Sequence, residues 1–106
     1  MRKIYAYTFP EHLTNRTSSG KFLVKVGDTE REPLDRIREQ DVTSNAHAPI
    51  VLLNPTEDVS FRDYKVHEIL ESFGAVRERK TREWFWTDVD EVKRAINMAI
   101  PAENAT

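Results

Sequence analysis

The chain has 106 residues, of which 39% are hydrophobic and 32% are charged, and its mean hydropathy is −0.64. This length supports one small hydrophobic core and excludes a two-domain protein. The longest apolar run, 49–53, is too short for a membrane span or for the apolar region of a signal peptide. Cysteine is absent, which excludes disulfide scaffolds, thiolate zinc sites and cysteine nucleophiles. We therefore expect a soluble cytoplasmic protein with no membrane partner.

The formal net charge of −2 does not favour a strong autonomous nucleic-acid binder. Segment 77–82 is the local exception, because it holds four cations and one anion in six residues. Such a run is either a solvated turn or a local contact for a nucleic-acid backbone. Any affinity for DNA should therefore come from a local patch and depend on the salt concentration.

Two alternating segments predict a pair of strands near the amino terminus. Residues 3–9 alternate and are rich in aromatic side chains, which places Lys3, Tyr5, Tyr7 and Phe9 on one face. Pro10 ends this strand, and a polar loop occupies 11–20. Residues 21–27 alternate again and predict a second strand, most simply antiparallel to the first.

The rest of the chain predicts three helices and further extended segments. The Thr29-x-x-Glu32 spacing of a capping box predicts a helix over 32–40, on which Arg36 and Gln40 share a face. The apolar run 50–53 is typical of a strand buried on both faces. Helical spacing of apolar residues predicts a second helix over 60–73, and a third begins near Val89 and is closed by Pro101. The short segment 84–86 is predicted to be extended.

This order of elements predicts an α+β fold with a small, mainly antiparallel three-stranded sheet flanked by helices. We assign residues 1–100 to a single domain and 101–106 to a polar tail or a truncated linker. Such a tail is typical of a module of a longer protein, so further domains of a larger polypeptide are an expected partner.

The motifs of several enzyme classes are missing. The sequence contains no glycine-rich phosphate loop, no His-Glu-x-x-His and no serine elbow, and its three histidines have no ligand spacing. His67, next to the apolar Val66 on the second predicted helix, is either a packing residue or a substrate-binding one.

Four short segments together resemble the GIY-YIG nuclease superfamily. They are Lys3-Ile4-Tyr5, Lys25-Val26-Gly27-Asp28-Thr29, Arg36, and Arg82-Glu83-Trp84-Phe85. Their order is similar to that of a branch found in phage proteins, in meiotically up-regulated proteins and at the amino termini of bacterial helicase-like proteins. The resemblance runs from Lys3 to about Ile96, and the family's fold has a small antiparallel sheet with helices packed around it.

The resemblance implies a catalytic role for four residues. Tyr5 would orient or deprotonate the attacking water, together with Lys25, which stands where the family has its second tyrosine. Arg36 would contact the scissile phosphate, and Glu83 would bind a single divalent ion, Mg²⁺ or Mn²⁺. This division is chemically reasonable, because a phosphodiester under attack gains negative charge that a guanidinium and a hard cation stabilise.

Other side chains complete the expected DNA-binding surface. Arg79, Lys80 and Arg82 would steer the DNA backbone, and Gln40 and His67 are further candidates for substrate contact. Gln40 stands roughly where many relatives have His or Tyr, and Lys3 replaces the first glycine of the signature. Phosphate contacts position DNA without specifying its sequence, so we expect little sequence preference.

These observations leave more than one function open. The leading hypothesis is a metal-dependent endonuclease domain that hydrolyses DNA phosphodiester bonds, as a module of a larger helicase or restriction-related protein. The alternative is a non-catalytic DNA-binding or protein-interaction module, in which Lys25 and Gln40 mark a site that has lost its activity. A small regulatory protein without nucleic-acid contact is a third interpretation.

Overall fold

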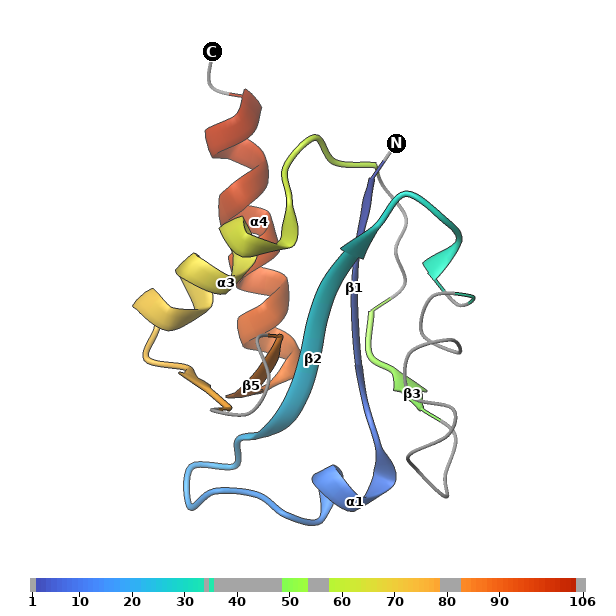
Figure 1. Ribbon diagram of the computed structural model, residues 1–106. Coiled ribbons are helices and arrows are strands. Elements are labelled where there is room, and N and C mark those ends of the chain that lie inside the picture. Colours follow the sequence, from blue (N-terminus) through green and yellow to red (C-terminus); the bar gives the residue numbers. More distant parts are fainter. Residues whose placement is uncertain (1, 34, 36–48, 54–57, 79–82, 105–106) are drawn as a thin grey trace.

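The computed structural model describes residues 2–33, 35, 49–53, 58–78 and 83–104. One antiparallel sheet has the strand order β3-β1-β2-β5-β4, with helices beside it (Figure 1). The elements are β1 (Lys3–Thr8), α1 (Pro10–Leu13), β2 (Phe22–Thr29), β3 (Ile50–Val51), α3 (Asp63–Ser72), β4 (Val76–Arg77), β5 (Trp84–Thr87) and α4 (Val89–Asn104). The predicted α+β class is confirmed, but the sheet has five strands and not three.

The long β1–β2 pair is the centre of the sheet. Its antiparallel register runs from Lys3 opposite Thr29 to Tyr7 opposite Lys25. In the connecting loop Gly20 has a φ of 85°, a conformation that glycine adopts without a steric penalty. The antiparallel pairing predicted from the two alternating segments is therefore confirmed.

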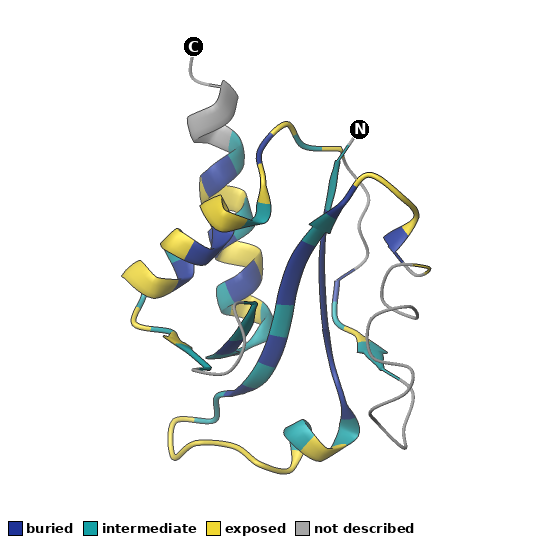
Figure 2. Cartoon of the chain, in the orientation of Figure 1, coloured by how far each residue is buried: buried dark blue, intermediate teal, exposed yellow. Residues whose placement is uncertain are grey.

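Helices α3 and α4 cover one face of the sheet (Figure 1). Val66 and Leu70 of α3 and Val92 and Ala95 of α4 pack with the strand side chains of that face. Figure 2 shows the buried residues gathered on the central strands and the inner sides of the helices. Burial of these apolar stripes stabilises the helices where they lie. Within the described ranges, none of the helices has the length and apolarity to cross a membrane.

Aromatic side chains form a second cluster from the other residues of β1. Tyr5, Tyr7 and Phe9 are at most 1% exposed, and Trp84 of β5 packs against them. Tyr5 and Tyr7 are stacked with ring centroids 6.1 Å apart, and Trp84 meets Tyr7 edge to face at 5.7 Å. The shared face predicted for Tyr5, Tyr7 and Phe9 is confirmed, and we call this cluster the aromatic face.

Three short elements differ from the sequence-based expectation. The run at 50–53 is not a strand buried on both faces, because β3 has two residues, lies at the sheet edge and leaves Val51 36% exposed. The one-turn helix α1 begins at Pro10 and takes up the start of the predicted loop, and 76–77 adds the second edge strand, β4. A two-residue strand has no period that a pattern can reveal.

The helices follow the predictions more closely. Gly74, with a φ of 95°, follows α3 as expected, and Asp88 accepts a hydrogen bond from the Glu91 N–H at the start of α4. Helix α4 continues to Asn104 and does not stop at Pro101. A proline fixes φ near the helical value, so it removes one hydrogen bond without ending this helix. The helix predicted over 32–40 lies mostly outside the described residues.

Gly27 makes room for Tyr5 on the aromatic face. The two residues are directly opposite in the β1–β2 register. A Cβ added at Gly27 would lie 2.6 Å from Tyr5 Cζ and still closer to its hydroxyl. The tyrosine ring therefore lies across the glycine backbone, in a position that no larger residue would allow.

We predict that Gly27→Ala destabilises the protein by about 1–3 kcal/mol, because the new methyl group overpacks the Tyr5 ring. Chemical denaturation of the single variants, and of the double variant with Tyr5→Leu, measures this effect. In the Tyr5→Leu background the cost of Gly27→Ala should fall by more than about 0.5 kcal/mol. An equal cost in both backgrounds would contradict the proposed contact.

Candidate active site

The candidate site lies where the pairing of β5 with β2 ends. Lys25 opposite Trp84 is the last pair of that ladder. One residue further, the Val26 N–H donates to the Glu83 carbonyl oxygen at 3.0 Å. Glu83 is therefore fixed through its backbone at the end of the ladder, and its side chain is 34% exposed.

Lys25 lies between Glu83 and the aromatic face. Its ammonium nitrogen is 3.6 Å from Glu83 Oε2 and 6.0 Å from the centroid of the Tyr7 ring. The Tyr5 ring stacks on the Tyr7 ring and lies over the backbone of Gly27, two residues after Lys25 on β2. The structure thus brings Tyr5, Lys25 and Glu83, three of the four predicted catalytic residues, to one end of the β2–β5 ladder.

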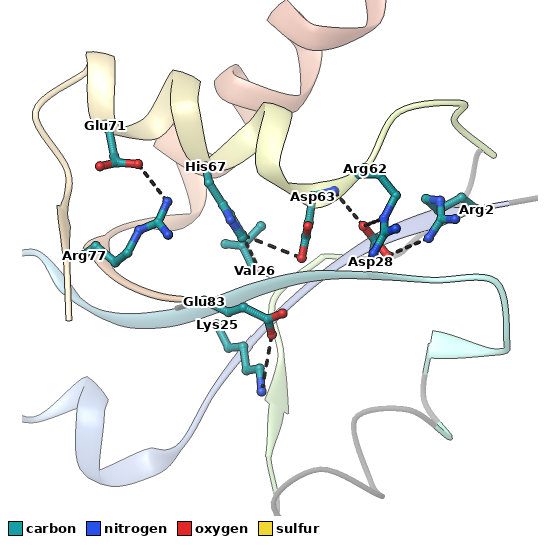
Figure 3. A network of polar contacts seen from close by, with 10 residues as sticks. All are labelled: Arg2, Lys25, Val26, Asp28, Arg62, Asp63, His67, Glu71, Arg77 and Glu83. Carbon is teal, nitrogen blue, oxygen red and sulfur yellow. Dashed lines mark hydrogen bonds and ion pairs between the residues drawn. The ribbon is translucent and has the colours of Figure 1, made fainter. Parts of the chain in front are cut away.

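A buried carboxylate on β2 holds the start of α3. Asp28, whose side chain is 6% exposed, accepts a hydrogen bond from the Asp63 N–H at 2.7 Å. Arg62 Nε lies 3.1 Å and Arg2 Nη1 2.7 Å from its two oxygens (Figure 3). Since the residue before α3 provides no side-chain cap, Asp28 caps this helix from a neighbouring strand.

The amino-terminal half of α3 places Asp63 and His67 next to β2. Asp63 Oδ2 and His67 Nε2 are 4.0 Å apart, and Nε2 lies 2.7 Å from the Val26 carbonyl oxygen. Figure 3 shows these two side chains above the β2 ribbon and the Lys25–Glu83 pair at and below it. Groups from both sides of β2 therefore meet near Val26.

Neighbouring groups shift the pKa of Asp28 and the pKa of Asp63 in opposite directions. Burial raises the pKa of Asp28, but the hydrogen bonds from Asp63, Arg62 and Arg2 outweigh it and hold that pKa below its usual value. Burial and then the charge of Asp28 raise the pKa of Asp63, and Glu83 adds to this rise while His67 opposes it. Glu83 is therefore close enough to Asp63 for their charges to repel.

Glu83 and Asp63 provide the oxygen ligands that a hard divalent ion prefers. Among the described residues, no three His, Cys, Asp or Glu side chains gather as a metal-binding group. Mg²⁺ needs no such group, because it keeps several waters and binds one or two carboxylates together with substrate phosphates.

The remaining predicted site residues have different positions. His67 is 5% exposed and lies in the core between α3 and β2. Arg36, Gln40, Arg79, Lys80 and Arg82 lie outside the described residues.

Sequence analysis missed Asp28 and Asp63. Asp28 belongs to the second motif of the resemblance, but its function as a helix cap depends on a residue 35 positions later. Asp63 has one local signal, because it lies four residues before His67 and so shares a helix face with it. Neither contact with β2 is visible in the spacing.

Comparison with known families agrees with this geometry. A family model described as the T5orf172 domain matches residues 4–100. The chain belongs to the T5orf172 family. This domain is a GIY-YIG-like nuclease branch found in phage and other proteins, which indicates a nuclease-like or DNA-binding module. No curated protein and no solved structure gives a significant match to the chain.

We predict that Asp28→Asn lowers the free energy of unfolding at neutral pH by about 2–3 kcal/mol, because charge-assisted hydrogen bonds to the start of α3 are lost. The folded-state pKa of Asp28 is depressed, so its ionised form stabilises the fold above the unfolded-state pKa. This contribution disappears as the pH falls below about 4 and through the folded-state pKa.

Urea denaturation of both proteins at several pH values measures this difference. It should be constant above about pH 5 and shrink at lower pH. Asp35→Asn, at an exposed position, is the control and should have little effect. A difference for Asp28→Asn that does not change with pH would contradict the role of the Asp28 charge.

Proposed function

We propose that this T5orf172 domain is a metal-dependent endonuclease that hydrolyses DNA phosphodiester bonds. The observation that carries the proposal is the meeting of Tyr5, Lys25 and Glu83 at the end of the β2–β5 ladder. Family membership supports it, because the model of a nuclease-like branch matches residues 4–100. We also propose that the domain is a module of a larger helicase or restriction-related protein.

Tyr5 and Lys25 would handle the attacking water. The Tyr5 hydroxyl lies over the backbone of Gly27, on the face that carries Lys25. In the proposed reaction, a water oxygen attacks phosphorus and gives up a proton, the bond to the leaving oxygen breaks, and the leaving oxygen takes a proton from solvent. Tyr5 would orient this water or accept its proton, and the Lys25 ammonium would stabilise negative charge that builds on the phosphate oxygens.

Glu83 would hold the single Mg²⁺ or Mn²⁺, and the Asp63 carboxylate across β2 would add negative charge to its surroundings. When bound, the ion would stabilise charge on the phosphate and favour ionisation of water. Glu83 is positioned for this by its backbone bond to Val26, and its exposed fraction leaves room for water ligands. Asp63 is held independently, by the Asp28 cap at the start of α3.

Residues outside the described ranges complete the proposal. Arg36 would contact the scissile phosphate with a planar guanidinium, and Gln40 shares its predicted helix face. Arg79, Lys80 and Arg82 would steer the DNA backbone from the cationic segment that immediately precedes Glu83. DNA is thus the proposed partner, with sequence-independent contacts.

We predict that the protein nicks supercoiled plasmid at low salt with Mg²⁺ or Mn²⁺, and not with EDTA. Glu83→Gln should lower the rate by roughly 10²-fold or more, because it removes the charge that would hold the ion. Glu68→Gln, at an exposed position of α3, removes the same charge away from these contacts and should keep wild-type activity. Single-stranded DNA is tested in the same series.

One observation favours the non-catalytic alternative. The Glu83 charge is already paired with Lys25, as expected if the pair has only a structural role. If wild type and Glu83→Gln bind DNA equally and neither cuts it, the protein is a binding module. Lys25→Met separates the two cases, since it should abolish nicking in an enzyme but only weaken salt-dependent binding in a module.

A further inference from the structure

His67 is a buried histidine whose ring bonds to the backbone of another element. It comes from α3, and its Nε2 lies 2.7 Å from the carbonyl oxygen of Val26 on β2, 41 residues earlier. The ring also packs against Phe85, with centroids 4.9 Å apart. Because its Nε2 is bonded to the Val26 carbonyl oxygen, the ring is well placed to fix a strand.

Val26 is the residue of β2 that this bond can influence most. Its neighbours are Lys25, which pairs with Glu83, and Gly27, over which Tyr5 lies. Its own N–H donates to the Glu83 carbonyl oxygen. The N–H and the C=O of Val26 therefore join β2 to the start of β5 on one hand and to α3 on the other.

Asp63 of α3 and Asp28 of β2 hold the part of α3 that carries His67. Asp63 lies one turn earlier, and its Oδ2 is 4.0 Å from His67 Nε2. The Asp63 N–H is held by Asp28, so the first turn of α3 cannot slide along β2 without breaking that bond. Because a carbonyl oxygen only accepts, His67 carries a proton on Nε2, and this N–H is the donor.

We propose that His67 is a positioning residue, whose Nε2–H bond to Val26 sets Lys25, Glu83 and Asp63 at their mutual distances. This inference rests on the proposed endonuclease function and replaces a direct substrate contact of His67. The bond acts on the carbonyl group of Val26. Val26 lies between Gly27, over which the Tyr5 ring lies, and Lys25, which pairs with Glu83. Losing it leaves a buried carbonyl oxygen with one partner fewer and lets β2 shift against α3.

The first experiment compares His67→Leu, which has no donor, with His67→Gln, whose amide nitrogen can replace Nε2–H. We expect His67→Leu to lower kcat for plasmid nicking by about 10–100-fold with KM for DNA nearly unchanged, as for residues that orient metal ligands. The metal concentration for half-maximal activity should rise as well. His67→Gln should recover most of the loss.

A matched control separates positioning from general destabilisation. Val66→Ala opens a cavity in the core beside His67 but leaves the bond to Val26 in place, so it should lower Tm while keeping kcat. The inference is overturned if His67→Leu keeps wild-type kcat, if His67→Gln is no better than His67→Leu, or if Val66→Ala with the same Tm loses as much kcat. An effect confined to KM for DNA would also overturn it and would return His67 to substrate binding.

A second measurement does not need activity. Amide hydrogen exchange should show the Val26 N–H exchanging at least about tenfold faster in His67→Leu than in Val66→Ala of equal stability. Equal exchange would overturn the inference. If wild type fails to nick DNA but the Val26 amide responds, the endonuclease proposal fails while the His67–Val26 link is supported as a structural one.

Discussion

The Asp28 carboxylate is the constraint on which the arrangement of the site depends. Its side chain is 6% exposed near the end of β2, and its oxygens accept from a backbone N–H and two guanidinium groups. A buried charge is tolerated only when it is bonded in this way, so the start of α3 has to stay against β2. Asp63 and His67 follow within the next turn and a half, and their positions behind β2 are consequences of this one contact.

Val26 transfers this constraint to the other side of the sheet. Neighbouring residues of a strand point to opposite faces, so Lys25 and Gly27 lie with the aromatic side chains and Val26 packs below α3. Glu83 stands just before β5 begins, where it pairs with Lys25 and where its charge helps to raise the pKa of Asp63. A small sheet can therefore bring together groups from both of its faces at a point where one strand ends.

The sequence predicts the parts of this structure that have a period, and it misses those that depend on distant contacts. Alternation identifies β1 and β2 and places Tyr5, Tyr7 and Phe9 on one face, because burial of one face leaves a repeat of two. The two-residue strands β3 and β4 carry no repeat, and an apolar run such as 50–53 does not reveal whether its strand is central or at an edge. Asp28 and Asp63 look like ordinary surface carboxylates until α3 is placed against β2.

The charged side chains of the site connect the proposed binding of a divalent ion with the proposed binding of a DNA phosphate. The negative charge of Asp28 is compensated by Arg2 and Arg62, and that of Glu83 by Lys25. Asp63 has a histidine as its partner, and the charges of both other carboxylates act on it. Burial and the two neighbouring charges raise the pKa of Asp63, so the ionised form carries a cost that a cation bound nearby would relieve. A DNA phosphate alone would increase the same repulsion. In an endonuclease built this way, the divalent ion and the phosphate would therefore favour each other's binding.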